Sequence, residues 1–283
     1  MPNRDALFMA TREVFPTPLV KQVILELRFP NLFFMENRIG EFQIGIMKDF
    51  PQAALVHRRN FMVLAAILDS PEMQDAAMRQ QRQSDIEKIW QFKSETGTRV
   101  EVSSQSMSLV TEKHTSYTEG GETSFRSIAE TAVGQFLSFT KLPSLLRVGL
   151  RYINECPLFD RTTDTFRSCY NSILPVEKFG LESLTLANCV AVARSGNGQI
   201  QHAESLRFAQ PTIAALAGHG HAAMVQPLIF DALILDLDAS SENVAAERVL
   251  TTTDELHQMI AAEFETVIKA PIIEHMRKKK DEN

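Results

Sequence analysis

The sequence is poor in cysteine, in positive charge and in long apolar runs, and each shortage argues against a class of protein. Its three cysteines, Cys156, Cys169 and Cys189, are odd in number and lack zinc-ligand spacing, which argues against a disulfide framework or a cysteine-rich metal site. A net charge of −6 gives the chain no overall attraction for nucleic acid. No apolar run approaches the about 18 residues of a membrane span, and residues 1–5 do not begin a signal peptide. We therefore expect a soluble cytoplasmic protein with no membrane partner.

Length and hydrophobic content are sufficient for a substantial core. The 283 residues are 44% hydrophobic and 23% charged, which is ordinary for a globular protein. A chain of this length forms one large domain or two of about 140 residues. We predict two halves, residues 1–145 and 146–283, with an insertion at residues 52–88. The two halves can also form one continuous domain.

Hydrophobic periodicity predicts the elements of the first half. Residues 19–29 alternate as in a strand until Pro30, which has no N–H group for a ladder. Further alternating runs predict a meander, and helical apolar spacing stops at Pro51 and at Pro143. The expected helices cover residues 33–50 and 124–142, and the expected meander covers residues 89–94, 98–103 and 107–111. Residues 61–68 fit a strand or a helix, and residues 71–89 fit an exposed helix or a mobile insertion.

The second half repeats this order of elements. A strand that begins near Arg147 is followed by a short helical piece, two strands about a turn, a further strand and a long terminal helix. We expect Thr253 to cap the terminal helix and Pro271 to kink it. The expected helices cover residues 176–184 and 254–279, the strands cover residues 185–194, 200–208 and 227–238, and the turn covers residues 195–198.

Each half thus has the order β-α-β-β-β-α, which defines the predicted fold class. We expect an α+β protein of two tandem β-α-β-β-β-α halves, with antiparallel sheets that each pack on a long helix and a pseudo-twofold relation between the halves. Such sheets form either one continuous saddle or two facing grips. The duplication rests on element order alone, because the halves share no convincing residue identity.

The most informative segment is residues 146–156, where two arginines interrupt an otherwise apolar strand. Arg147 and Arg151 have the same parity, so they lie on one face of that strand. Removal of a guanidinium from water costs several kcal/mol unless acceptors meet its donors. We therefore expect an ion pair from one of these arginines to Glu26, Asp236 or Asp238.

Three segments together resemble a sporadically distributed, uncharacterised family of bacterial proteins of similar length. The resemblance covers most of the chain and rests on Pro18, Leu19, Glu26, Phe29, Pro30, Trp90, Phe92, Arg147, Gly149, Leu150, Arg151, Tyr152 and Asn154. The chain departs from the family at Lys21 and Gln22, where an acidic residue is expected. The resemblance implies no specific activity, and the patchy distribution of the family implies a mobile or defence-related locus.

Two groups of residues could hold a metal ion. His219 and His221 flank a glycine in a loop that could bend both rings toward one point, although no third ligand is evident. Asp236 and Asp238 share one face of a strand and could hold Mg²⁺ in a metal-dependent hydrolase, whereas Asp231 points to the other face. The alternative is that these acids pair with the strand arginines or end a strand, and we favour this alternative and predict no metal and no cofactor.

The sequence contains no phosphate-binding loop, no nucleophile and histidine pair, and no zinc-ligand pattern. We therefore expect a non-catalytic binding or regulatory protein that engages a protein partner or a small ligand against its sheets, and we name no catalytic residue. The predicted binding residues are Arg147, Arg151, Tyr152, Asn154, Glu26 and Arg28. Besides the hydrolase, an alternative is nucleic-acid binding across a saddle, by analogy with TATA-binding proteins.

Overall fold

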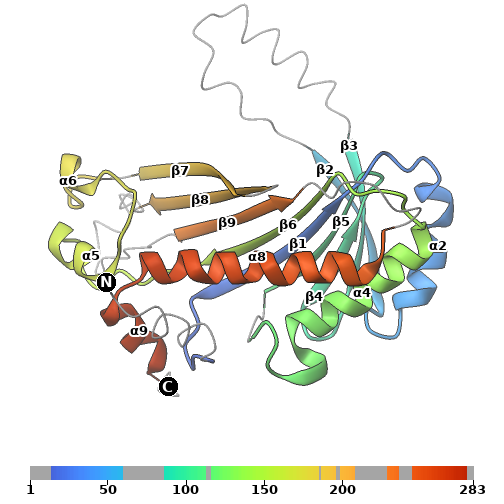
Figure 1. The fold of residues 1–283 in the computed structure, drawn as a ribbon, viewed down its shortest axis with the longest axis horizontal. Helices are drawn as coiled ribbons and strands as arrows, with labels where there is room; N and C mark the ends of the chain where they lie inside the picture. Colours follow the sequence, from blue (N-terminus) through green and yellow to red (C-terminus); the bar gives the residue numbers. More distant parts are fainter. Residues whose placement is uncertain are drawn as a thin grey trace, which may run out of the picture.

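In the computed structural model the chain folds around one antiparallel sheet (Figure 1). The structure describes residues 14–59, 86–112, 116–184, 186–195, 198–207, 228–235 and 244–278. Nine strands of this part pair in the order β2-β3-β4-β5-β1-β6-β9-β8-β7. Their bounds are β1 Val20–Arg28, β2 Gln52–Arg59, β3 Ile86–Lys93, β4 Thr98–Val102, β5 Ser106–Thr111, β6 Arg147–Asn154, β7 Leu186–Ser195, β8 Gly198–Arg207 and β9 Leu228–Leu235.

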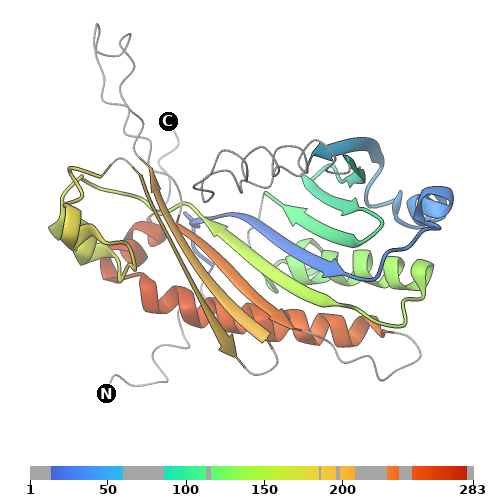
Figure 2. The ribbon, with the colours of Figure 1, turned by 90° about the horizontal axis from the view of Figure 1, so that it is seen from above.

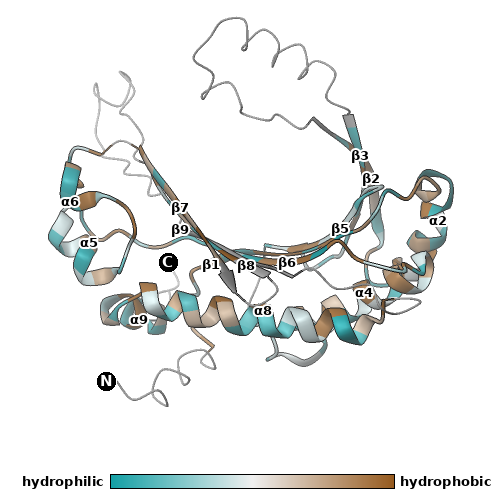
Figure 3. Cartoon of the chain, turned by 45° about the horizontal axis from the view of Figure 1, so that its top comes forward, coloured by the Kyte–Doolittle hydropathy of each residue, from teal (hydrophilic) through white to brown (hydrophobic). Residues whose placement is uncertain are grey.

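The described helices gather on one side of this sheet, which curves away from them (Figure 3). The longest helix, α8, packs along β6 and β9, while α4 packs against α8 and α2 packs against α4. Their bounds are α2 Met35–Ile46, α4 Phe125–Thr140, α5 Thr163–Cys169, α6 Val176–Phe179, α8 Ala246–Val267 and α9 Ala270–Arg277, and η2 is a turn of 3-10 helix at Gly121–Thr123. No helix in the described ranges is both long enough and apolar enough to cross a membrane.

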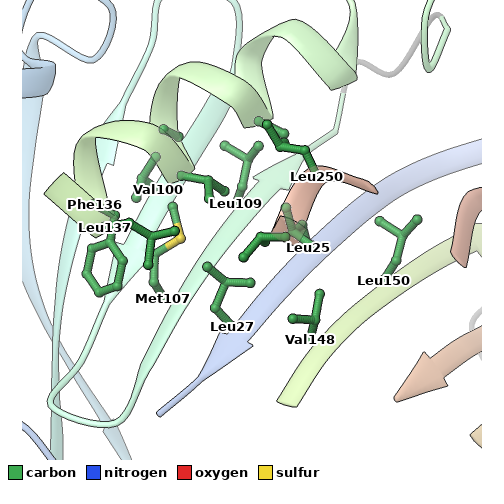
Figure 4. Packing of buried hydrophobic residues seen from close by; sticks show 14 of the residues in the cluster. Leu25, Leu27, Val100, Met107, Leu109, Phe136, Leu137, Val148, Leu150 and Leu250 are labelled. Atoms are coloured by element: carbon green, nitrogen blue, oxygen red, sulfur yellow. The ribbon is translucent and has the colours of Figure 1, made fainter. Parts of the chain in front are cut away.

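Strand alternation creates the main core between the sheet and these helices (Figure 4). On β1, Val23, Leu25 and Leu27 are fully buried, whereas the residues between them are partly exposed. Their partners include Phe136 of α4 and Leu150 of β6. Because buried aliphatic area is the main source of folding energy, this layer fixes which face of the sheet is covered.

A second cluster of buried residues closes the other end of the helix layer. It joins α5, α6 and α9 to the end of α8 and to β7 and β8. Tyr170, which is 1% exposed, follows α5, and its hydroxyl donates to the carbonyl of Pro157 at 2.5 Å. The two clusters lie on the same side of the sheet, so the opposite side is free of described helices.

The predicted α+β class and the antiparallel pairing are confirmed. The prediction for the first half, however, omitted one strand that the structure contains. Strand β2 lies in the span left unassigned, and it forms one edge of the sheet. The first half therefore has the order β-α-β-β-β-β-α. The two groups of strands share one sheet, because β1 pairs directly with β6. Residues 61–68 and most of residues 71–89 lie outside the described residues.

The predicted start of the terminal helix is wrong. The helix begins at Ala246, and Thr253 lies inside it, where its hydroxyl donates to the carbonyl of Val249 at 2.8 Å. The predicted kink is a complete break, because α8 ends at Val267 and Pro271 sits in the first turn of α9. A proline is tolerated there because the first amides of a helix have no partner within it.

The short helical region of the second half also differs from the prediction. The helix expected at residues 176–184 is the single turn α6, and it ends at Gly180, whose φ of 71° few other residues adopt. Helix α5 was not predicted from the sequence. Its N-cap is Thr162, whose hydroxyl accepts from the amide of Thr165 at 3.3 Å.

The N-cap of α4 provides a test of this local structure. The Ser124 hydroxyl accepts from the Ser127 amide at 3.3 Å, so Ser124→Ala leaves that amide without its acceptor. We expect Ser124→Ala to lower the free energy of unfolding by about 1 kcal/mol in urea denaturation. Ser124→Thr keeps the hydroxyl and is the control, and equal losses in both variants would contradict the role of the cap.

Candidate functional site

The side of the sheet opposite the helices is the candidate functional surface. Figure 3 shows that this side is concave, and we call it the concave face. Residues of β1 and β6 that alternate with the buried ones point to it. Three of them are the basic residues Arg28, Arg147 and Arg151. Charged side chains on the two central strands therefore stand at the middle of the concave face.

Glu26 holds two of these arginines together. Arg28 and Arg147 are direct partners across β1 and β6, a position in which like charges repel. The Glu26 carboxylate lies 3.3 Å from Nε of Arg28 and 3.8 Å from Nη1 of Arg147. The predicted ion pair between a strand arginine and Glu26 is thus confirmed for Arg147. It is a partly exposed pair, so its main effect is to order the three side chains.

A glycine makes this arrangement possible. Gly149 is the register partner of Glu26, and it lies two residues after Arg147 on the same face. A methyl group on Gly149 would stand 3.4 Å from Nε and from Nη2 of Arg147. The guanidinium therefore lies over the glycine, along the path to Glu26. A side chain larger than alanine at this position would displace Arg147 from Glu26.

Arg151 lies further along β6 and is exposed on the concave face. Its register partners are Ile24 of β1 and Asp231 of β9. The prediction that Arg147 and Arg151 share one face is confirmed, but the expectation that both are buried is wrong, because Arg151 is exposed and Arg147 is only partly buried. The reason is that no described helix covers this face, so a guanidinium there keeps its contact with water.

A pocket of about 260 Å³ adjoins the charged centre on the concave face. It is lined by Glu26, Arg28, Phe29, Glu87, Ile89, Glu101, Ser103, Gln105, Ser106, Ser108 and Leu146. Glu101 is fixed by Arg99, whose Nε lies 2.8 Å away, and by the side-chain amide of Gln91 at 2.9 Å. The lining is mainly polar, with hydroxyl donors and carboxylate acceptors from adjacent strands.

Tyr152 and Asn154, also predicted as binding residues, point to the helix side of β6. Tyr152 is 6% exposed and Asn154 is 2% exposed. The Tyr152 hydroxyl forms a 2.9 Å hydrogen bond with Nδ1 of His257 on α8. The structure therefore brings Glu26, Arg28, Arg147 and Arg151 together on one face and places Tyr152 and Asn154 on the other.

His257 belongs to a partly buried polar cluster that was not predicted from the sequence. We call it the tyrosine–histidine cluster, and it comprises Tyr117, Arg126, Tyr152, Asp254 and His257. The His257 ring stacks on Tyr117 at 3.9 Å between centroids. Oδ1 of Asp254 accepts from the Tyr117 hydroxyl at 2.6 Å and from Nε of Arg126 at 2.8 Å. Burial lowers the pKa of His257 to about 4 and raises the pKa of Tyr117 and Tyr152, so the ring and both hydroxyls are neutral at pH 7.

A second buried cluster joins β8 to α8. We call it the histidine–glutamate cluster, and it comprises Ser172, His202, Glu204 and Glu263. Nε2 of His202 lies 2.9 Å from Glu204, and Nδ1 lies 2.7 Å from Glu263. Glu204, 1% exposed, also accepts from the Ser172 hydroxyl and from the Ile173 amide. Burial lowers the pKa of His202, but the hydrogen bonds to both carboxylates outweigh burial and raise the pKa.

Both clusters are structural in character. Each lies between the sheet and α8, and its groups are matched donor to acceptor within the cluster. The pocket lies on the other side of the sheet. Among the described residues, no group of three or more potential ligands could hold a metal ion. His219, His221, Asp236 and Asp238 lie outside the described residues.

The sequence held only a partial signal for these clusters. His202 and Glu204 are two residues apart on an alternating strand, so a shared face could be predicted. Asp254 and His257 are three residues apart on a helix, so a shared face could also be predicted for them. Their partners Glu263, Tyr117 and Tyr152 come from distant segments, and no local pattern identifies them.

A scan against models of protein families found none that matches the chain, and a search of the curated proteins found no match.

The depressed pKa of His257 predicts a loss of stability in acid. The unfolded chain binds a proton near pH 6.5, whereas the folded chain binds it only near pH 4. Stability is therefore complete above pH 6.5 and falls by up to about 3 kcal/mol as the pH drops to 4. His257→Phe keeps the ring stack, and we expect its unfolding free energy to fall less over this range. Equal acid losses in wild type and variant, measured by urea denaturation, would rule out His257 as the cause.

The raised pKa of His202 predicts the opposite response. Its stabilising contribution is complete below its unfolded pKa of 6.5 and is lost as the pH rises through the higher folded value. We expect wild-type stability to decline on this alkaline side. His202→Gln keeps one hydrogen bond without a titrating group, so it is less stable at pH 6 but has a flatter profile from pH 6 to pH 9. A variant profile as steep as that of wild type contradicts the assignment.

Proposed function

We propose that this protein is a non-catalytic binding or regulatory protein that holds a protein partner on the concave face of its sheet. The observation that carries the proposal is the asymmetry of the sheet. One side is buried under α2, α4 and α8, while the other presents ordered charged side chains at its centre. On the helix side, the polar groups of the two clusters bind one another within the fold. On the concave face, Arg28 and Arg151 are exposed to solvent.

The chemistry of the concave face suits a protein partner with mixed polar groups. Arg147, Arg28 and Glu26 are ordered by one another, so a partner that binds them gives up little side-chain entropy. Arg151 adds an exposed guanidinium, and arginine is enriched at the energetic centres of protein interfaces. The adjacent pocket offers space for a side chain of the partner.

A nucleic acid fits this surface less well. A saddle-shaped sheet with central arginines is the feature that favours it. However, Glu26, Glu87 and Glu101 line the pocket beside those arginines and would repel phosphate groups. The chain as a whole carries a net charge of −6. Filter binding at low salt tests this alternative, because even nonspecific binding is strongest there.

The architecture supports the further proposal that the chain contains a tandem duplication with pseudo-twofold symmetry. Outward from the centre, β1 is followed by β5, β4 and β3, and β6 is followed by β9, β8 and β7. Each group thus places its first strand at the centre and its last strand next to it. Each group also leads into a helix on the same face, α4 or α8. Strand β2 is then an addition at the edge of the first group.

We place this interaction in the cytoplasm. Cys156, Cys169 and Cys189 are all free thiols, and two of them are buried. Free thiols in the core suit a reducing compartment. The family resemblance of the central strands adds a bacterial, mobile or defence-related setting to the proposal.

Charge reversal at Arg151 tests the proposed face. We expect Arg151→Glu to reduce recovery of the partner at least tenfold when the tagged protein is purified from its native host and analysed by mass spectrometry. Because Arg151 is exposed, the melting temperature should change little. Arg248→Glu is the matched control, since Arg248 is an exposed arginine on α8, on the helix side. Equal recovery with both variants, or loss with Arg248→Glu alone, contradicts the proposal.

A further inference from the structure

The strand at the far edge of the sheet, β7, has unusual features for a terminal strand. It pairs with β8 over ten residues, from Leu186 to Ser195, and no described strand pairs with its other side. Figure 2 shows it as the outermost strand at this end of the sheet. An edge of this length presents a row of backbone N–H and C=O groups that can accept another strand.

Over most of its length, from Leu186 to Ala193, β7 lacks the side chains that prevent such pairing. Natural edge strands are usually protected by charges, proline, bulges or short length. The segment from Leu186 to Ala193 has no charged residue and no proline, and its register with β8 is continuous. The opposite edge of the sheet differs, because β2 ends in the basic sequence His57, Arg58 and Arg59. The two edges are therefore not equivalent.

Exposed aliphatic side chains line one face of β7. Leu186, Val190 and Val192 are 55%, 60% and 57% exposed, and equal parity places them on one face of the strand. Within Leu186–Ala193 the other position of this parity is Asn188, whose side-chain oxygen already accepts from the Ser205 hydroxyl at 2.6 Å, and Arg194 follows this segment. The row thus combines apolar side chains with backbone groups that pair with no described strand, which is the pattern of an edge that receives a neighbouring strand.

We propose that β7 pairs antiparallel with β7 of a second copy of this chain, so that two sheets join into one. The backbone groups that the described strands leave open are those of a strand ladder, so the occupant is itself a strand. A second copy fits because twofold antiparallel pairing sets an uncharged segment against itself, with no like charges in contact. The aliphatic row of each copy then contacts that of the other, which removes these side chains from water. The dimer would carry two concave faces, but its existence does not depend on what those faces bind.

Sedimentation and light scattering of the purified full chain test the dimer. We expect wild type to have twice the 31.8 kDa mass of one chain. We expect Val190→Lys, alone or with Val192→Lys, to be a monomer, because an edge lysine discourages strand pairing. Both positions are exposed, so the variants should retain their circular dichroism and melting temperature.

The matched control is Leu55→Lys. Leu55 lies on the opposite edge strand β2 and is 52% exposed, so this variant should remain a dimer. A monomeric wild type overturns the proposal and leaves the edge to a strand of another protein. A dimer that persists in the double lysine variant, or one that Leu55→Lys dissociates equally, also overturns it. Recovery of a partner through Arg151 is measured separately, so failure of one proposal is distinct from failure of the other.

Discussion

The pairing of β1 with β6 is the interaction on which the rest of the structure depends. It runs from Val20 opposite Asn154 to Arg28 opposite Arg147, and it joins strands from both parts of the chain into one sheet. On one side it aligns Leu25 with Leu150, which buries both in the main core. On the other side the same register brings Arg147 toward Glu26. One backbone ladder therefore sets both the core and the candidate binding surface.

Polar groups are stabilised in different ways on the two sides of the sheet. On the helix side they are withdrawn from water, and burial there is tolerated because each group meets a partner of matching chemistry. His257 stays neutral, whereas hydrogen bonds to carboxylates raise the pKa of His202, since one ring lies between tyrosines and the other between carboxylates. On the concave face, Arg28 and Arg151 keep their contact with water, and we propose that they serve recognition. This division is why we propose the arginines, rather than the histidines on the helix side, as binding residues.

Much of this arrangement could be predicted from the sequence, and the failures have physical causes. Alternation located β1 and the meander, because one face of each strand is buried. Strand β2 could not be predicted, because residues Gln52 to His57 of this edge strand are all exposed. Its sequence therefore shows no alternation of buried and exposed positions. Tyr152 and Asn154 differ in parity from Arg151, so the period of two in a strand places them on the opposite face of β6 and apart from the predicted site. Pairs such as Tyr152 with His257 join distant segments, and only the fold reveals them.

The central claim is that partners bind the concave face, and site-specific photo-crosslinking tests it most directly. A photoreactive residue would replace Gln22 of β1 or Ser108 of β5 on the concave face, and Glu247 or Glu255 on the exposed side of α8. The account predicts crosslinks to the co-purified protein from the first two positions and none from α8. Crosslinks from α8, with none from the sheet, would contradict the account.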